Sequence, residues 1–182
     1  MLVRPSSPPV FVYGTLMAPE VLQVLIGKIP QITQPAFVAN YNRWKVKGCV
    51  FPGLTPSATK SNCAHNLEES CVQGMLLHDL ESSEQDIFNW FEGNKYSLQK
   101  ILVWVPASSS LLTTSMNDGL KDDADFTFDF NNKREWKQNE AKAYVWANSI
   151  NELQKEQWSY GQFRSEHLTT SSKKLWFHVE KN

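Results

Sequence analysis

The chain has 182 residues, about the length of one domain, and its 41% hydrophobic residues suffice for one buried core. Its 18 basic and 19 acidic residues give a formal net charge of −1 without any run of Lys or Arg, which disfavours a nucleic-acid partner. The longest apolar stretches are far shorter than the roughly 18 residues that a membrane-spanning helix needs, so we expect no membrane span. The sequence leaves the oligomeric state open.

The first residues, Met1 to Pro9, contain three prolines and one arginine and are expected to form a flexible N-terminus. They lack the hydrophobic segment of a signal peptide. The chain also has an odd number of cysteines, Cys49, Cys63 and Cys71, which is typical of reduced thiols. Together these features predict a cytoplasmic protein.

A strand, a tight turn and a helix are predicted next. Val10 to Tyr13 are β-branched and aromatic and predict a strand that ends at Gly14. Apolar residues at helical spacing follow Pro19, which suits the first position of a helix, and Gly27 suits the position after its end. We therefore expect a helix between Pro19 and Gly27.

The following part of the chain alternates between strand patterns and loops. Two strands are predicted within 36–50, separated by a turn near Asn42. The run Phe51-Pro52-Gly53-Leu54-Thr55-Pro56 is bounded by prolines and predicts a rigid loop, and the polar residues 57–70 predict a surface loop. Val72 to Leu77 again has the composition of a strand.

A second helix is expected before Gly93, which suits the position after a helix end. Ser82 or Ser83 can cap its start, and its apolar residues include Phe88. Glu92 is then the last residue of this helix.

Two further strands are predicted, at Tyr96–Val105 and Ala141–Ala147. The segment Pro106 to Glu140 between them is rich in Ser, Asp and Asn and too long for a hairpin loop, which predicts a partly disordered acidic insertion. Glu152 to Leu168 has apolar residues at helical spacing and predicts a terminal helix that packs on the sheet. We expect residues 10–182 to form one domain.

The turn around Gly14 can bind an anion. The first N–H groups of a helix have no partner within the helix and face the positive end of its dipole, so they can hold a carboxylate or an oxyanion. Gly14 allows a close approach to the backbone because it has no Cβ. By itself, however, such a turn is more often a plain connection.

Glu92 is the candidate proton-transfer residue. Because it ends its helix beside Trp90 and Phe91, the helix dipole and the loss of hydration are both expected to raise its pKa. A carboxyl group with a raised pKa suits proton exchange. The alternative is a solvated glutamate at a helix end, which is the more frequent case for a single glutamate.

Other catalytic and metal-binding patterns are poorly matched. The chain has no Gly-x-Ser-x-Gly elbow, no His-Glu-x-x-His pair and no Walker A loop. The residues Cys63, His65, Cys71 and His78 do not have the spacing of a zinc site, and Asp122 to Asp129 lack the order of an EF-hand loop. We therefore expect no metal ion and no cofactor.

Five blocks of residues occur in a specific order: Phe11–Leu16, Asn42–Gly48, Phe51–Ser57, Val72–Gly74 and Phe91–Tyr96. In this order they resemble the γ-glutamylcyclotransferase-like superfamily, especially its plant and fungal branch related to an avirulence-induced protein. The Tyr-Gly turn alone is a modest signal, whereas the series of blocks is specific.

This resemblance implies an α+β fold in a single domain, with a small mixed or antiparallel β-barrel flanked by helices. It also implies γ-glutamyl cyclotransferase activity on a small molecule, in which a γ-glutamyl group closes to 5-oxoproline and an amine or amino acid is released. Glu92 would be the proton acceptor. The substrate would be bound by Tyr13, Gly14, Thr15, Leu16, Met17 and Ala18, with Tyr96 and Tyr144 as further candidates.

One position departs from the pattern of the family, which usually has Leu-Asp shortly before its catalytic glutamate. This chain has Phe88-Asn89 there, so a carboxylate that could tune Glu92 by like-charge repulsion is missing. This departure and the acidic insertion leave a non-catalytic role open, and only a substrate panel would separate the possible leaving groups, so two alternatives stay open. One is a γ-glutamylamine cyclotransferase that acts on ε-linked lysine products, and the other is a non-catalytic protein that binds a small ligand or a partner.

Overall fold

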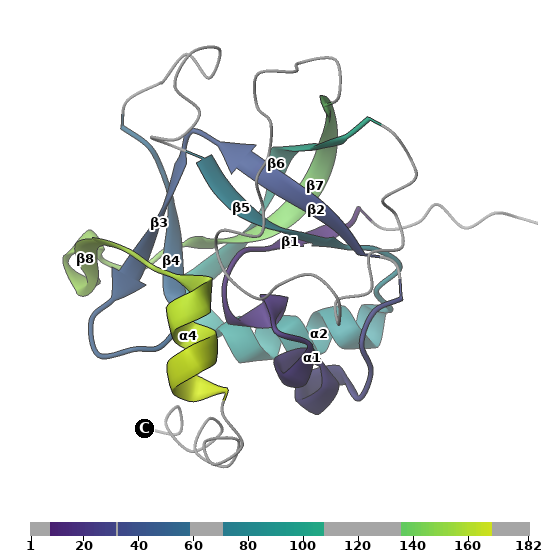
Figure 1. The fold of residues 1–182 in the computed structure, drawn as a ribbon, viewed down its shortest axis with the longest axis horizontal. Helices are drawn as coiled ribbons and strands as arrows, with labels where there is room; N and C mark the ends of the chain where they lie inside the picture. Colours follow the sequence, from purple (N-terminus) through teal and green to yellow (C-terminus); the bar gives the residue numbers. More distant parts are fainter. Residues whose placement is uncertain (1–7, 32, 59–70, 108–135, 169–182) are drawn as a thin grey trace, which may run out of the picture.

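The computed structural model describes residues 8–31, 33–58, 71–107 and 136–168 (Figure 1). Predictions that fall on 1–7, 59–70, 108–135 and 169–182 lie outside the described residues. The helices and strands are β1 (Val10–Val12), η1 (Thr15–Met17), α1 (Pro19–Ile26), β2 (Thr33–Ala39), β3 (Tyr41–Val46), β4 (Pro52–Pro56), β5 (Cys71–Leu77), α2 (Ser82–Glu92), η2 (Gly93–Lys95), β6 (Tyr96–Pro106), β7 (Trp136–Trp146), η5 (Ile150–Glu152), β8 (Leu153–Gln157) and α4 (Tyr160–His167).

In the described part of the chain, five strands close into a barrel in the order β1-β5-β2-β6-β7. β1 runs parallel to β7, whereas the other paired neighbours are antiparallel. Apolar side chains such as Phe11, Val38 and Val103 form a buried core of the barrel, because alternate residues of each strand point to the same face. The helices α1, α2 and α4 flank the barrel (Figure 1). The predicted α+β fold with a mixed barrel flanked by helices is therefore confirmed.

The helices α1 and α2 lie next to each other below the barrel (Figure 1). The predicted bounds of α1 are confirmed, since Pro19 is its first residue and Gly27 follows its end in the left-handed conformation, with a φ of 73°. The predicted end of α2 is also confirmed. Its last residue is Glu92, and Gly93 follows with a φ of 62°.

The predicted cap of α2 at Ser82 or Ser83 is wrong, because Glu81 caps this helix. The Glu81 carboxylate accepts a hydrogen bond from the backbone of Glu84, and the Glu84 carboxylate accepts one from the backbone N–H of Glu81 at 2.9 Å. Lys28 adds an ion pair with Glu84 at 2.6 Å. This reciprocal arrangement leaves both serines inside the first turn.

The strands β4, β3 and β8 form a separate sheet in this order. The prediction of a rigid loop at Phe51–Pro56 is wrong, because Pro52–Pro56 is strand β4 and pairs with β3. Its prolines lie at the ends of an edge strand, where a missing N–H need not cost a sheet hydrogen bond. The turn before β3 lies at Asn40, which has a φ of 63°, and not near Asn42.

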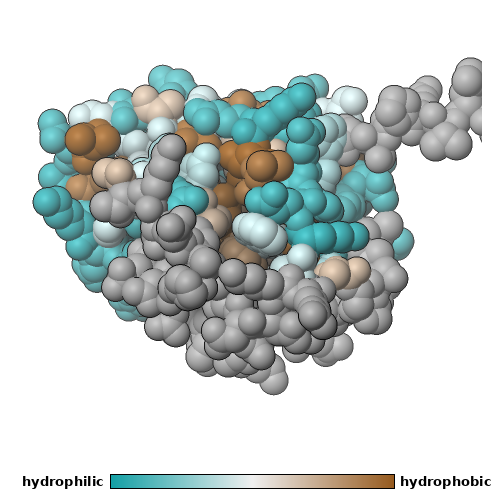
Figure 2. Space-filling model, turned by 90° about the horizontal axis from the view of Figure 1, so that it is seen from above, coloured by the Kyte–Doolittle hydropathy of each residue, from teal (hydrophilic) through white to brown (hydrophobic). Residues whose placement is uncertain are grey.

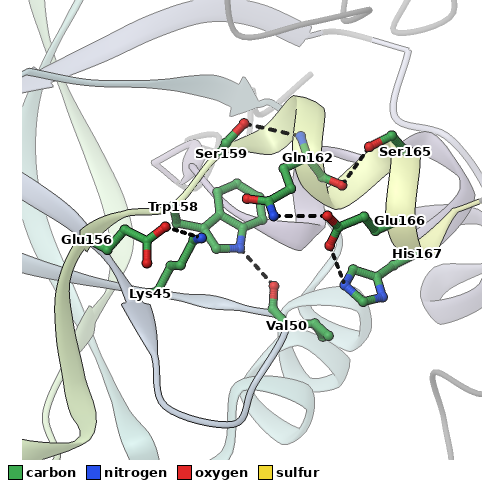
Figure 3. Close-up of polar contacts among 9 residues, drawn as sticks. All are labelled: Lys45, Val50, Glu156, Trp158, Ser159, Gln162, Ser165, Glu166 and His167. Atoms are coloured by element: carbon green, nitrogen blue, oxygen red, sulfur yellow. Dashed lines mark hydrogen bonds and ion pairs between the residues drawn. The ribbon is translucent and has the colours of Figure 1, made fainter.

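The predicted helix at Glu152–Leu168 is only partly correct, since α4 begins at Tyr160 and β8 occupies much of the earlier part. β8 pairs antiparallel with β3. Beyond this strand, Trp158 anchors the chain because its indole N–H donates to the carbonyl oxygen of Val50 at 2.8 Å (Figure 3). These long-range pairings outweigh the helical spacing of the apolar residues.

Ser159 caps α4, because its hydroxyl oxygen accepts a hydrogen bond from the Gln162 backbone at 3.1 Å (Figure 3). We expect Ser159→Ala to lower the free energy of unfolding by about 1 kcal/mol, since this N–H loses its partner. Urea denaturation measures the change. The control is Ser165→Ala, which removes an exposed hydroxyl of the same helix and should cost less than about 0.5 kcal/mol. Equal losses would contradict the capping role.

β6 and β7 pair from Tyr96 opposite Trp146 to Pro106 opposite Trp136. β7 therefore begins at Trp136 and not at the predicted Ala141, because the residues before Ala141 continue the pairing with β6. Both ends of the segment predicted as an insertion thus belong to the barrel, and its part at 108–135 lies outside the described residues.

The surface shown in Figure 2 has hydrophobic residues in the middle of its described part, with hydrophilic residues around them.

On α2, Phe88 is fully buried whereas Trp90 is 72% exposed, so this helix turns one face to the core and another to solvent. None of the helices within the described ranges is long and apolar enough to cross a membrane.

Candidate active site

A pocket lies where the chain passes from β1 into η1. Its other walls come from the start of β4, the end of α2, and single tyrosines of β6 and β7. The space between these walls, open mouth included, is about 310 Å³. The lining residues are Phe11, Val12, Tyr13, Gly14, Thr15, Leu16, Phe51, Pro52, Glu92, Tyr96 and Tyr144. The structure thus brings the predicted turn together with the predicted glutamate and both further tyrosines.

The η1 turn separates the predicted substrate-binding residues into two groups. Thr15 and Leu16 line the pocket, and their backbone N–H groups have no hydrogen-bond partner among the described residues. By contrast, the N–H of Met17 donates to the Gly14 carbonyl at 2.9 Å, and that of Ala18 donates to the Thr15 carbonyl at 3.1 Å. Met17 and Ala18 are also buried in the core and do not line the pocket.

Gly14 is needed for packing. A Cβ at this position would lie 2.8 Å from two ring carbons of Pro52, whereas its φ of −131° is accessible to any residue. The close approach that glycine permits is therefore made by Pro52. Phe51 and Pro52 also line the pocket, although the sequence pattern predicted only a loop there. The one sequence feature that could have indicated this role is that both residues belong to the block Phe51–Ser57, which resembles the family.

Tyr13 ties the turn to the barrel. Its hydroxyl donates to the carbonyl oxygen of Tyr144, and its own carbonyl accepts a hydrogen bond from Nη1 of Arg43 at 2.9 Å. Burial raises the pKa of Tyr13 well above its usual value, and the negative charge of Glu92 raises it further, against a smaller opposing effect of a hydrogen bond from the Leu54 backbone. Tyr13 therefore stays protonated at neutral pH.

Tyr144 is held by two amide side chains of α2. Its hydroxyl accepts a hydrogen bond from Nε2 of Gln85 at 2.7 Å and donates one to Oδ1 of Asn89 at 2.7 Å. Burial and then the charge of Glu92 raise the pKa of Tyr144, and the hydrogen bond from Gln85 lowers it in part. Gln85 was missed by the sequence analysis, because it carries no pattern of its own.

Tyr96 forms part of the pocket wall. Its hydroxyl donates to the carbonyl oxygen of Pro52 at 2.7 Å, and its ring contacts the edge of Trp146 at a centroid distance of 5.3 Å. The Phe51 ring lies 6.3 Å from the Tyr96 ring, also in an edge contact. These contacts hold the aromatic side of the pocket in place.

Glu92 reaches the pocket from the C-terminal end of α2 and is half-buried. It lines the same pocket as Tyr13 and Tyr144, and its charge raises the pKa of both hydroxyl groups. The arrangement joins a carboxylate to backbone N–H donors within one pocket. Such a combination can take up a proton and bind a negatively charged oxygen at the same time.

The raised pKa of Tyr144 predicts a loss of stability at high pH. Above about pH 10 an unfolded tyrosine releases its proton while the native Tyr144 keeps it, so the stabilisation is present below pH 10 and is lost as the pH rises. The slope is about 1.4 kcal/mol per pH unit for each such group. We expect urea denaturation to show that, between about pH 10 and pH 11, the free energy of unfolding falls less steeply with pH for Tyr144→Phe than for the wild type. Equal slopes would contradict the raised pKa.

Within the described ranges, no group of three or more His, Cys, Asp or Glu residues could hold a metal ion. His78 and Cys71 belong to these ranges, and burial lowers the pKa of His78. Cys63, His65 and the acidic segment Asp122 to Asp129 lie outside the described residues.

Most of this chain matches a known family. Residues 10–165 match the family described as "Gamma-glutamyl cyclotransferase, AIG2-like", and the chain belongs to this family. The resemblance expected from the sequence blocks is therefore confirmed.

Two curated relatives come from Arabidopsis thaliana. AIG2-like protein D is 33% identical over 133 residues, which cover 71% of this chain and 78% of the relative. AIG2-like protein C is 28% identical over 150 residues, with 81% and 79% covered. A solution structure of another Arabidopsis thaliana protein has a TM-score of 0.54 at 20% identity and covers 82% of this chain and 76% of its own. This last likeness concerns the fold alone.

Proposed function

We propose that the protein cyclises the γ-glutamyl group of a small γ-glutamyl compound to 5-oxoproline and releases an amine or amino acid. The main support for this proposal is that one pocket is lined by Glu92 and by Thr15 and Leu16, whose N–H groups have no partner among the described residues. Membership of the AIG2-like gamma-glutamyl cyclotransferase family supports it.

The substrate supplies its own nucleophile in this reaction. The α-amine nitrogen attacks the γ-carbonyl carbon and forms the new C–N bond of a five-membered ring, while the bond from that carbon to the leaving nitrogen breaks. An α-amino group with a pKa of about 8 is mostly protonated at neutral pH, so a base is needed before the attack. Glu92 takes that proton and then returns a proton to the leaving nitrogen. The protein mainly orients the reacting groups and moves protons.

Negative charge develops on the carbonyl oxygen during the attack. The N–H groups of Thr15 and Leu16 stabilise this charge or hold the substrate carboxylate, because they are preorganised donors without a protein partner in the described ranges. Glu92 is the only charged side chain among the described lining residues. A substrate carboxylate would therefore be bound in the pocket by backbone N–H groups and hydroxyl groups and not by a cation of the described lining.

The leaving group separates two versions of the proposal. A γ-glutamyl amino acid releases an amino acid, whereas an ε-(γ-glutamyl)lysine releases the side-chain amine of lysine. A panel that contains both kinds of compound, assayed for 5-oxoproline, separates them by their kcat/KM values. If the protein bound 5-oxoproline but produced none from any compound of the panel, it would be a binding protein and the proposal would fail.

A further inference from the structure

The face of α2 that meets β7 carries two amides and a carboxylate. Gln85, Asn89 and Glu92 follow one another at intervals of four and three residues, which places them on the same side of a helix. Tyr144 lies against this face, since both amides bind its hydroxyl and Glu92 acts on it electrostatically. The hydroxyl is therefore bonded to the Asn89 amide and shares one pocket with the Glu92 carboxylate, a second group of this helix face that can accept a proton.

The hydrogen bonds fix the direction of the phenolic proton. A tyrosine hydroxyl has one proton, so the bond to Oδ1 of Asn89 at 2.7 Å withholds that proton from Glu92. Nε2 of Gln85 donates a hydrogen bond to the same hydroxyl oxygen at 2.7 Å. If the proton turned to Glu92 instead, it would stabilise the carboxylate and make it a weaker base.

We propose that Gln85 and Asn89 are positioning residues, which turn the Tyr144 hydroxyl away from Glu92 and so keep the carboxylate basic. This inference rests on the proposed function for its catalytic meaning. It also gives a physical role to Asn89, the residue that departs from the family pattern, since a neutral amide accepts the hydrogen bond without adding a second charge beside Glu92.

The surroundings of Glu92 decide the sign of the expected pH effects. Besides Tyr144, the pocket that it lines contains Tyr13, which follows β1, while Asp86 of α2 acts on Tyr144 and Arg43 of β3 acts on Tyr13. Lys95 of η2 lies nearby, 5.4 Å from the ring of Phe51 in the pocket wall. A carboxylate at position 89 would thus add negative charge close to Glu92 and favour its protonated form.

Asn89→Leu and Asn89→Asp test the inference in opposite directions. Leucine frees the phenolic proton to reach Glu92, so kcat should fall about three- to tenfold and the acid limb of the kcat/KM profile should move to lower pH. Aspartate keeps the acceptor but adds a charge, so the acid limb should move to higher pH while activity at the new optimum stays within about threefold. Asn151→Leu, at an exposed site of η5, is the control and should change neither quantity.

The double variant Asn89→Leu/Tyr144→Phe separates this role from a structural one. Because phenylalanine has no proton to give to Glu92, the second change should restore kcat to within about threefold of Tyr144→Phe alone. A merely structural Asn89 would give no rescue, and additive losses would overturn the inference.

An NMR measurement that needs no substrate can test the positioning role separately from the proposed function. The Tyr144 hydroxyl proton should give a slowly exchanging NMR signal in the wild type and in Asn89→Asp, and this signal should move to a different chemical shift in Asn89→Leu, where Glu92 replaces the amide as acceptor. An unchanged chemical shift in Asn89→Leu would overturn the positioning role, whether or not the wild type is active. A wild type with this signal but without 5-oxoproline release would contradict the proposed function alone.

Discussion

Glu92→Gln is expected to fold as the wild type does and to lose a factor of about a hundred to ten thousand in kcat. Glutamine keeps the size of the side chain, but an amide cannot accept the proton of the substrate amine. The loss corresponds to about 2.7 to 5.5 kcal/mol of transition-state stabilisation. The measurement is the rate of 5-oxoproline release at saturating substrate, together with thermal unfolding as a check of the fold.

Glu140→Gln is the matched control for this variant. Glu140 lies on β7 and is exposed, so the same chemical change should leave both kcat and thermal stability unaltered. Full activity in Glu92→Gln, measured beside this control, would remove Glu92 from the mechanism.

The second large effect is expected for Gly74→Ala, which should lower the free energy of unfolding by about 3 kcal/mol or more. A Cβ at Gly74 would lie 2.3 Å from the carbonyl oxygen of Val12 and 2.7 Å from the ring of Phe11. Because β1 pairs with β5 through Val12 and Met75, the clash forces these two neighbouring strands of the barrel apart next to the pocket. Urea denaturation gives the change in free energy, and the unfolding temperature should fall by roughly 10 °C.

Gly48→Ala distinguishes this clash from the ordinary cost of replacing a glycine. Gly48 has a φ of 69°, and no atom of the described residues lies within 4 Å of the place that a Cβ would occupy. The cost at Gly48 is therefore conformational and about 1 kcal/mol. If Gly74→Ala and Gly48→Ala lowered the free energy of unfolding by similar amounts, the close contact between β1 and β5 would not be the reason for a glycine at position 74.

Local patterns predicted the elements whose ends are set by their own residues. Pro19 and Gly27 bound α1 because the first lacks an N–H where none is needed and the second adopts a left-handed conformation. The end of α2 at Glu92 was predictable for the same reason. The place of Glu92 and of the Gly14 turn therefore followed from the sequence.

Elements that depend on distant partners were harder to predict. β4 and β8 become strands by pairing with β3, although one is bounded by prolines and the other has apolar residues at helical spacing. Glu81 was missed as a cap because glutamate is not among the usual capping residues. The contact between Gln85 and Tyr144 joins residues that are 59 positions apart, which no local pattern indicates.

The turn predicted to bind substrate lies at the pocket, but only part of it lines the pocket, for a related reason. Sequence alone treats its successive N–H groups as equal donors, whereas hydrogen bonds within η1 already use those of Met17 and Ala18. Only the earlier residues of the turn, Thr15 and Leu16 among them, line the pocket. The prediction thus located the turn, and the geometry of η1 decides which of its donors are available.

The most direct measurement is the release of 5-oxoproline by the wild-type protein from a panel of γ-glutamyl amino acids and γ-glutamyl amines. We predict that at least one compound yields 5-oxoproline and its free amine in equal amounts, and that Glu92→Gln suppresses both. If no compound of the panel yielded 5-oxoproline, or if Glu92→Gln released it at the wild-type rate, the proposed reaction at this pocket would be contradicted.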